Sequence, residues 1–277
     1  MTETRHVLGL SGGRDSAALA VYMRQRHPEI DVEYFFTDTG KELPEVYDYL
    51  TRLEGYLGKP IRRLNPDRDF DFWLKSYRNY LPSAQSRWCT RQLKLRPFEH
   101  WVRKYLDEGH SVVSYVAIRG DEEYREGYQS KKDALMVRLP FKDAGIDKAG
   151  VIEILDGSGL GLPKYYDWRT RSGCTFCFFQ QKIEWVRLKE RHPDAFEEAK
   201  SYEKTAMEHG SPFTWSHGES LTQLETPERQ EQIRANHEKR VARAQVKLQA
   251  NPLRPDIQLD DDDIYGGAAK ACLTCHK

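Results

Sequence analysis

The sequence predicts an α/β fold in which a parallel sheet flanked by helices is followed by a helical C-terminal extension. Two observations predict it. In the first half of the chain, short apolar runs alternate with stretches of helical spacing, which is the pattern of a parallel sheet. After Asp143 this alternation ends, and longer, highly charged helical stretches replace it.

The expected strands of the first half end at turns that favour a ligand site. These strands are 6–10, 32–37, 61–64 and 112–118, and the helices expected between them are 15–26, 44–57 and 93–106. Two strands stop at glycine turns, Ser11-Gly12-Gly13 and Asp38-Thr39-Gly40, and Arg119-Gly120 follows the fourth strand. Ligands of open parallel sheets bind beyond the carboxyl ends of the strands. The three turns are therefore predicted to lie at one site.

The second half is predicted to be mainly helical. A short helix is expected at 151–155, and longer charged helices at 182–209 and 227–249. Thr226-Pro227 is a helix start signal, because a capping hydroxyl precedes a proline at the first helical position. Residues 251–263 carry two prolines and four adjacent aspartates, and are interpreted as a solvated linker.

Composition excludes several classes of protein. The 277 residues include 43 basic and 43 acidic side chains, so no global field draws the chain to nucleic acid or membrane, and a nucleic-acid partner would need a local patch. No apolar run approaches membrane-spanning length, and the polar start of the chain is not a signal peptide. We therefore expect a water-soluble cytoplasmic protein, in which disulfides are disfavoured.

The hexapeptide Ser11-Gly12-Gly13-Arg14-Asp15-Ser16 predicts a phosphate-binding loop. Two glycines let the backbone turn tightly and approach a ligand. The following helix offers unpaired N–H groups and the positive end of its dipole. The serine hydroxyls and the arginine add donors and charge. An ordinary strand–turn–helix junction is the alternative for a bare Gly-Gly turn, but the whole hexapeptide after the first strand favours phosphate.

The loop resembles the S-G-G-x-D-S loop of the PP-loop ATP pyrophosphatase superfamily, and the chain looks most like its phosphoadenosine-phosphosulfate reductase branch. Four further segments carry this resemblance, and together with the loop they cover about residues 5 to 200. They are 36–45 (FTDTGKELPE), 89–97 (CTRQLKLRP), 119–122 (RGDE) and 173–177 (GCTFC). The resemblance implies a Rossmann-like sheet of the adenine nucleotide alpha hydrolase type. It also implies a PP-loop ATP-binding domain at 1–200, followed at 201–277 by a helical extension with a linker and a Cys-x-x-Cys tail.

The chain departs from the family pattern at several positions. Arg14 stands where lysine is common, and Ala117 and Glu123 replace the glycine and serine of the third element. Thr90 stands where the second cysteine of a pair would be. The C-terminal Glu-Cys-Gly-x-x-His segment of the reductases is absent, and the chain ends in ACLTCHK. These departures argue against sulfonucleotide reduction and leave nucleotide binding untouched.

The resemblance implies attack on the α-phosphate of ATP, giving an adenylated acceptor and pyrophosphate. The loop residues 11–16 would bind the phosphates, and Mg²⁺ would offset their charge. Asp15, Lys94 and Arg119 are the implied catalytic residues, and Asp38, Thr39 and Gly40 join the nucleotide site. Asp38 contacts the nucleotide or its metal, or alternatively caps the next helix.

The five cysteines predict a metal site. Two Cys-x-x-Cys pairs can hold one metal or cluster, whereas a single cysteine is usually a small buried hydrophobe. A [4Fe-4S] cluster is the favoured interpretation and structural zinc is the alternative. In one arrangement Cys89, Cys174, Cys177 and one of Cys272 and Cys275 are ligands, and the fifth thiol carries a persulfide. In the other, the two pairs form the site and Cys89 carries sulfur.

Adenylation chemistry combined with extra thiols suggests sulfur insertion. The combination resembles bacterial DNA phosphorothioation proteins, which work with a cysteine desulfurase and, with other subunits, form a modification system. DNA is therefore a candidate partner, and the basic residues of 227–249 are candidates to contact it, although a solvated helix is the simpler interpretation. The alternatives are a sulfonucleotide reductase and a non-catalytic nucleotide-binding subunit; tRNA thiolation is disfavoured because no RNA-binding module is apparent. The sequence names neither the acceptor nor the oligomeric state.

Overall fold

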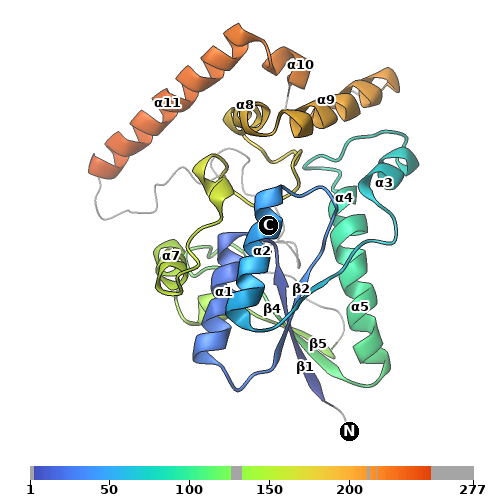
Figure 1. The fold of residues 1–277 in the computed structure, drawn as a ribbon, viewed down its shortest axis with the longest axis vertical. Coiled ribbons are helices and arrows are strands. Elements are labelled where there is room, and N and C mark those ends of the chain that lie inside the picture. The colour runs from blue at the N-terminus through green and yellow to red at the C-terminus, as the bar shows by residue number, and fades with distance from the viewer. Residues whose placement is uncertain (1–2, 126–132, 211–212, 217, 251–277) are drawn as a thin grey trace. The chain divides into compact units, whose positions relative to one another are not determined.

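The computed structural model describes residues 3–125, 133–210, 213–216 and 218–250 (Figure 1). These residues form two compact units. The α/β unit consists of 3–76 and 86–174, and the helical unit consists of 77–85 together with the described residues from 175 onward. The boundary between the two compact units lies after residue 174. The expected boundary at residue 200, between an ATP-binding domain and a helical extension, stays a prediction.

The α/β unit contains a five-stranded sheet in which every neighbouring pair is parallel, in the order β3-β2-β1-β4-β5. This confirms the predicted fold class. The strands are β1 (Thr4–Leu10), β2 (Val32–Phe36), β3 (Ile61–Arg63), β4 (Ser111–Tyr115) and β5 (Leu135–Arg138). The sequence pattern missed β5, because this short strand lies at the edge of the sheet and none of its side chains is fully buried.

Helices cover both faces of the sheet. In chain order β1, α1 (Arg14–Arg26), β2, α2 (Pro44–Leu57) and β3 step toward one edge, and the chain then returns past β1 through α5 (Arg96–Asp107) to form β4. Right-handed crossovers in opposite directions put their helices on opposite faces. Accordingly α1 lies beside α2 and α7 (Lys148–Gly157), while α5 packs against the other face (Figure 1). The strand order reverses between β1 and β4, which is where such sheets bind ligands.

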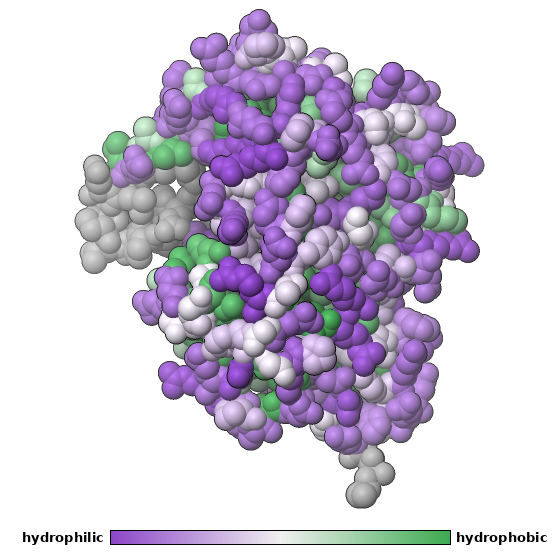
Figure 2. All heavy atoms as spheres, in the orientation of Figure 1, coloured by the Kyte–Doolittle hydropathy of each residue, from purple (hydrophilic) through white to green (hydrophobic). Residues whose placement is uncertain are grey.

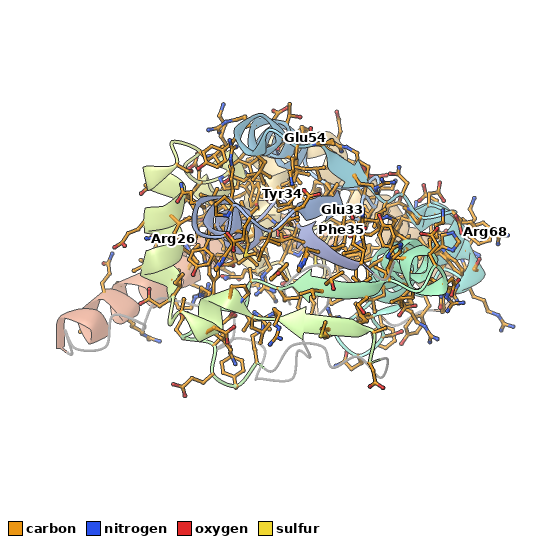
Figure 3. All side chains as sticks on the ribbon, turned by 90° about the horizontal axis from the view of Figure 1, so that it is seen from below. Arg26, Glu33, Tyr34, Phe35, Glu54 and Arg68 are labelled. Carbon is orange, nitrogen blue, oxygen red and sulfur yellow. The ribbon has the colours of Figure 1, made fainter. Side chains whose placement is uncertain are left out.

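The face under α5 holds a core in which Phe35 packs between Phe98 and Trp101 of α5, with ring centroids 5.0 and 5.2 Å away. Gly9 makes room for it, since a Cβ there would lie 2.9 Å from the Phe35 ring. Side chains alternate along β2, so Glu33 lies on the same face as Phe35 and Tyr34 on the other (Figure 3).

Short elements connect the main ones in the α/β unit. They are α3 (Phe70–Ser76), α4 (Trp88–Thr90), the π-helical turn η1 (Arg91–Leu95), α6 (Pro140–Asp143) and the 3₁₀ turn η2 (Lys164–Asp167). The helix expected from residue 93 begins at Arg96 instead. Pro97 occupies its first turn, where a missing N–H costs nothing, and the π-helical turn precedes it.

The helical unit contains α8 (Lys182–Arg191), α9 (Pro193–Glu208), α10 (Leu221–Leu224) and α11 (Pro227–Ala250). The sequence pattern predicted one helix over 182–209, but Pro193 ends the first and starts the second, because proline cannot donate an N–H to the preceding turn. The start predicted from Thr226-Pro227 is confirmed.

A buried carboxylate organises the helical unit. Glu203 on α9 is 2% exposed, and its two oxygens accept the N–H groups of Trp215 (2.9 Å) and Leu221 (2.6 Å). The indole of Trp215 donates to the Ala199 carbonyl (2.8 Å) and its ring packs against Phe176. The loop before α10 is therefore fixed onto α9 by hydrogen bonds as well as by packing.

Hydrophilic residues predominate on the face of the molecule shown in Figure 2. Among the described residues, the exposed large hydrophobic side chains are scattered over different elements, as in Phe72, Met136 and Met207. None of the helices in the described ranges combines the length and the apolar character needed to cross a bilayer.

Candidate phosphate-binding site

The predicted phosphate loop joins the carboxyl end of β1 to the N-terminus of α1, beside the point where the strand order reverses. Its two serines bond to the loop itself. Ser11 N–H donates to the Ser16 hydroxyl (3.1 Å), which donates to the Gly13 carbonyl (3.2 Å). The Ser11 hydroxyl lies 3.1 Å from that of Ser16 and accepts the Gly13 N–H (3.3 Å). The loop is therefore held in a defined turn whose donors point at replaceable hydroxyl oxygens.

Two glycines make this turn feasible, each for its own reason. Gly12 has φ +70°, a conformation that favours glycine, and a Cβ there would lie 2.5 Å from Cγ1 of the buried Val46. Gly13 has an ordinary φ of −93°, but a Cβ there would lie 2.7 Å from the Ser172 hydroxyl. Neither position accommodates a side chain without displacing a neighbour.

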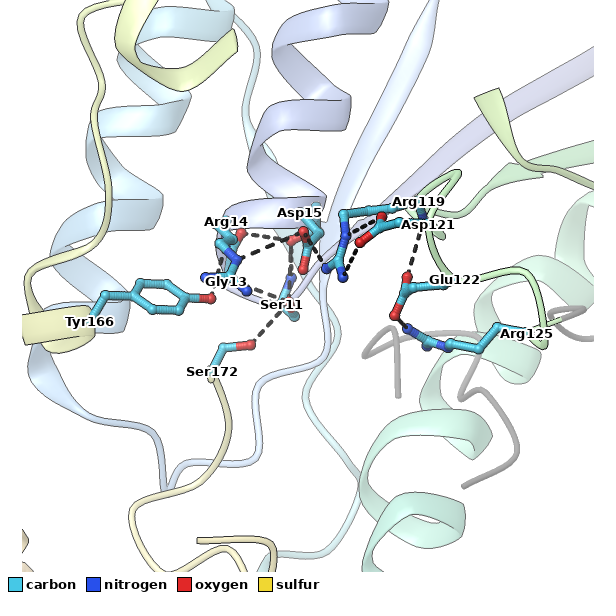
Figure 4. A network of polar contacts seen from close by, with 12 residues as sticks. Ser11, Gly13, Arg14, Asp15, Arg119, Asp121, Glu122, Arg125, Tyr166 and Ser172 are labelled. Carbon is cyan, nitrogen blue, oxygen red and sulfur yellow. Dashed lines mark hydrogen bonds and ion pairs between the residues drawn. The ribbon is translucent and has the colours of Figure 1, made fainter. Parts of the chain in front are cut away.

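A second segment, 165–172, contacts the loop from about 150 residues further along the chain. The Tyr165 hydroxyl donates to the Gly12 carbonyl (2.8 Å), and Arg14 N–H donates to the Tyr166 hydroxyl (3.2 Å). The Ser172 hydroxyl donates to that of Ser11 (3.2 Å) (Figure 4). None of these three residues was predicted from the sequence to belong to the site. The only signal for them was their place just ahead of the Gly-Cys-x-x-Cys segment, which says nothing about hydroxyl contacts.

Charged residues flank the loop on its other side (Figure 4). Arg119, after β4, is 8% exposed at its side chain and pairs with Asp121 (2.9 Å) and with Asp15 of α1 (3.3 Å). Its backbone N–H donates to Glu122 (3.1 Å), which pairs with Arg125. Burial disfavours the guanidinium charge, but the Asp121 hydrogen bond and the carboxylates of Asp15 and Glu122 outweigh it and raise the pKa of Arg119. Arg119 is thus a buried, permanent cation beside the loop.

Arg14 supplies a second cation at the start of α1. Its guanidinium lies 5.2 Å from the centre of the Tyr166 ring and 3.9 Å from the Asp15 carboxylate. Among the described residues its Nε has no hydrogen-bond partner, although this atom is buried. Arg14 and Arg119 therefore both lie near the carboxylate of Asp15, and they place two positive charges beside the loop.

The turn after β2 forms a separate hydrogen-bonded group. Asp38 accepts the Gly40 N–H (2.9 Å) and the Tyr47 hydroxyl (2.7 Å), and it lies 3.5 Å from the guanidinium of Arg63. It does not cap α2, because that helix begins after Leu43 with no side-chain cap. The helix-cap alternative is therefore wrong, and the nucleotide or metal role of Asp38 and its neighbours stays a prediction.

The structure describes three of the five predicted cysteine ligands. Cys89 lies in α4, and Cys174 lies beside the β2 turn, 3.4 Å from the Thr39 hydroxyl and 3.6 Å from the buried carboxylate of Glu42. Cys177 belongs to the helical unit. Cys272 and Cys275 lie outside the described residues.

No metal-binding group of three or more His, Cys, Asp or Glu residues is present in the described part of the chain. The iron–sulfur and zinc ligand sets stay predictions. Arg169 fixes the backbone at Cys174 by hydrogen bonds. Its buried guanidinium donates to the carbonyls of Gly173 (3.1 Å) and Cys174 (2.8 Å).

Of the predicted catalytic residues, the structure brings Asp15 and Arg119 together beside the loop. Lys94 lies in η1, on neither the loop nor the segments 119–125 and 165–172 that surround it. The assembled group offers N–H and O–H donors, two guanidinium groups and exposed edges of the Asp15 and Asp121 carboxylates. This combination suits a phosphate chain that enters with a hard cation.

Comparison with known proteins identifies several that are similar to this chain. Residues 5–132 match the family model described as phosphoadenosine phosphosulfate reductase domain. An uncharacterised protein of Methanocaldococcus jannaschii is 24% identical over 192 residues, covering 67% of this chain and 44% of that protein. The tRNA-specific 2-thiouridylase of Enterococcus faecalis is 22% identical over 191 residues, covering 60% of this chain and 51% of that protein.

The chain spans about half the length of the curated relatives it matches. Among solved structures it is similar to a phosphoadenylyl-sulfate reductase of Candida auris in a phosphate complex. That similarity has a TM-score of 0.45 at 14% identity and covers 63% of this chain and 81% of that one.

Proposed function

We propose that this chain, a PP-loop protein of the phosphoadenosine phosphosulfate reductase-like superfamily, cleaves ATP between its α- and β-phosphates and adenylates an acceptor for sulfur transfer. One observation carries the proposal. The loop 11–16, with its glycines, hydroxyls and helix N-terminus, stands beside a buried guanidinium at the carboxyl edge of the sheet, where the strand order reverses. That is the donor set that a departing pyrophosphate needs.

Each group has a role in this reaction. The amides of Gly13 and Arg14, together with the serine hydroxyls, bind the pyrophosphate-side oxygens. Arg119, which stays charged, stabilises the negative charge that builds up on pyrophosphate as it leaves. An electrostatic donor of this kind contributes most when it is already fixed in place, and the bond of Arg119 to Asp121 holds it there.

Membership of the PP-loop family implies that ATP is used with Mg²⁺. Mg²⁺ binds through one or two carboxylates and substrate phosphates, and it offsets phosphate charge. Asp15 and Asp121 fit this requirement, since both bond to Arg119 and their side chains are 25% and 29% exposed. They are the residues that would hold it. No step is assigned to an iron–sulfur cluster.

The acceptor in this proposal is the DNA backbone, with a cysteine desulfurase as the sulfur source. The persulfide sulfur would displace AMP from the adenylated phosphate, and a second thiol would cleave the resulting S–S bond, leaving a phosphorothioate and a disulfide. The motif resemblance supports it, and the similarity to a tRNA-specific 2-thiouridylase supports sulfur chemistry more broadly. The basic side chains of α11 add little, because Arg229 pairs with Glu219, Arg234 with Glu190, and Arg240 with Gln181. Incubation with DNA, ATP, cysteine and a desulfurase should yield phosphorothioate dinucleotides after nuclease digestion, detected by mass spectrometry. Their absence, with ATP still cleaved, would point to another acceptor.

Product analysis tests the ATP chemistry. Purified protein with Mg²⁺ and ATP should form AMP and pyrophosphate, separated by anion-exchange chromatography. Gly13→Val should abolish both products, because its side chain would enter the space beside Ser172 and block the phosphates. Formation of ADP and phosphate in place of AMP and pyrophosphate would refute the proposed cleavage.

A further inference from the structure

We propose that Ser172 is a phosphate-binding residue of the ATP site, so that the site is completed by a segment outside the 5–132 family match. This inference rests on the proposed function, since it assumes that the loop 11–16 holds the phosphates of ATP. It adds a ligand that the loop motif does not contain. It also assigns the 165–172 segment to the nucleotide site.

The first argument is the convergence of two donors on one atom. The Gly13 N–H (3.3 Å) and the Ser172 O–H (3.2 Å) both donate to the hydroxyl oxygen of Ser11. The Gly13 amide is the group that a phosphate loop presents to its ligand. A hydroxyl aimed at the same acceptor as this amide will also reach a phosphate oxygen that takes the acceptor's place.

The second argument is how closely Ser172 approaches the loop. It is 9% exposed, and its hydroxyl would lie only 2.7 Å from a Cβ at Gly13. Ser172 therefore contributes, together with the Ser11 hydroxyl at 3.2 Å, to the lack of room for a side chain at residue 13.

The third argument is that the neighbours of Ser172 fix the position of the segment. The Tyr165 hydroxyl, fully buried, donates to the Gly12 carbonyl. Tyr166 accepts the Arg14 N–H (Figure 4). Burial raises the pKa of Tyr165, so it remains a neutral phenol that can donate. These tyrosines act as positioning residues, and they keep the Ser172 hydroxyl beside the loop.

The test is calorimetric titration of the full chain with inorganic pyrophosphate. Ser172→Ala should weaken binding by about 10- to 100-fold, the effect of losing a hydrogen bond to a charged group. Ser172→Thr keeps the hydroxyl, so its affinity for pyrophosphate should stay within about threefold of that of the natural protein. Thr51→Ala is the matched control, because Thr51 carries an exposed hydroxyl on α2 that donates to its own helix, at the Tyr47 carbonyl.

The outcomes separate this inference from the proposed function. Equal pyrophosphate affinity in Ser172→Ala, with a lowered melting temperature, would make Ser172 merely structural and overturn the inference. If the alanine variant does not fold, Ser172→Cys keeps the shape with a weaker donor, and unchanged affinity in it would overturn the inference equally. Failure of the natural protein to bind pyrophosphate would instead refute the proposed function, and this inference with it.

Discussion

Two buried ions, one in each unit, are satisfied in different ways. Arg119 in the α/β unit is held by the side chains of Asp121 and Asp15, which are about a quarter exposed and can exchange it for water or a ligand. Glu203 in the helical unit is held by the backbone N–H groups of Trp215 and Leu221, which are themselves buried and fixed by the fold. We therefore expect Arg119 to be able to interact with a ligand, and Glu203 to have a structural role.

The largest expected effect comes from removing the buried carboxylate of Glu203. Glu203→Ala should destabilise the helical unit by about 2–6 kcal/mol, because two buried amides lose their acceptor at about 1–3 kcal/mol each. Urea unfolding followed by tryptophan fluorescence measures this. Glu208→Ala, an exposed carboxylate at the end of the same helix, is the control and should stay within about 0.5 kcal/mol. A similar loss in both variants would contradict the framework role.

The next effect concerns the glycine turn. Gly12→Ala should cost about 2–5 kcal/mol, because a left-handed backbone costs about 1–2 kcal/mol and overpacking against Val46 about 1–3 more. Gly40→Ala isolates the first contribution, since Gly40 has φ +69° and nothing within 4 Å of the added Cβ. Chemical denaturation of both variants should show the larger loss at Gly12. Equal losses would mean that Val46 moves aside freely.

A third prediction concerns the guanidinium group of Arg119. Arg119→Ala should weaken ATP binding by about 10- to 100-fold, the range expected for a hydrogen bond to a charged group. It should cost less stability than Glu203→Ala, because Asp15 and Asp121 can regain water. Calorimetry measures the affinity. Arg26→Ala, an exposed arginine at the end of α1, provides the comparison and should bind ATP normally. Normal affinity in Arg119→Ala would remove this residue from the site.

The smallest expected effect is a pH dependence inside the helical unit. Arg229 lowers the pKa of Glu219 from its ordinary 4.5, assisted by Lys182 and opposed by burial. A carboxylate with a lowered folded-state pKa contributes stability above its unfolded-state pKa and loses it as the pH falls through the folded-state value. The loss should be about 1 kcal/mol or less, and Glu219→Gln should remove it.

The contribution of Glu203 to stability should change with pH in the opposite direction. Its pKa is raised by burial, with the two backbone N–H bonds opposing, so its contribution is greatest below pH 4.5 and declines as the pH rises through the folded-state value. The loss of stability at acid pH that is expected from Glu219 can be checked by comparing the melting temperatures of the natural protein and Glu219→Gln at neutral and at acid pH. A difference between them that does not change with pH would contradict it.

The fold followed from the sequence wherever local pattern determined it. Four of the five strands were predicted, because β1, β2, β3 and β4 combine apolar runs with turns, and the helix over Pro44–Leu57 was located to the residue. β5 was missed because it is a short edge strand with little buried surface. The helix predicted over 182–209 was too long, since Pro193 outweighed the continuous pattern.

The candidate site was predictable only in part. The loop 11–16 and Arg119 could be predicted, because each follows the end of an apolar strand and lies next to glycine. Tyr165, Tyr166 and Ser172 do not, because hydroxyl contacts across about 150 residues leave no periodicity in the sequence. The cysteine ligand set stays a prediction, since spacing of thiols in a sequence does not say which ones meet.

Backbone amide NMR with inorganic pyrophosphate tests the central claim, that the loop 11–16 binds phosphate, most directly. Saturating pyrophosphate should shift the amide resonances of Gly13 and Arg14, which the structure shows donating to replaceable hydroxyl oxygens. The amide of Trp215, fixed to Glu203 in the helical unit, should stay where it is. Binding that leaves Gly13 and Arg14 unshifted, or that shifts Trp215 in their place, would contradict the account.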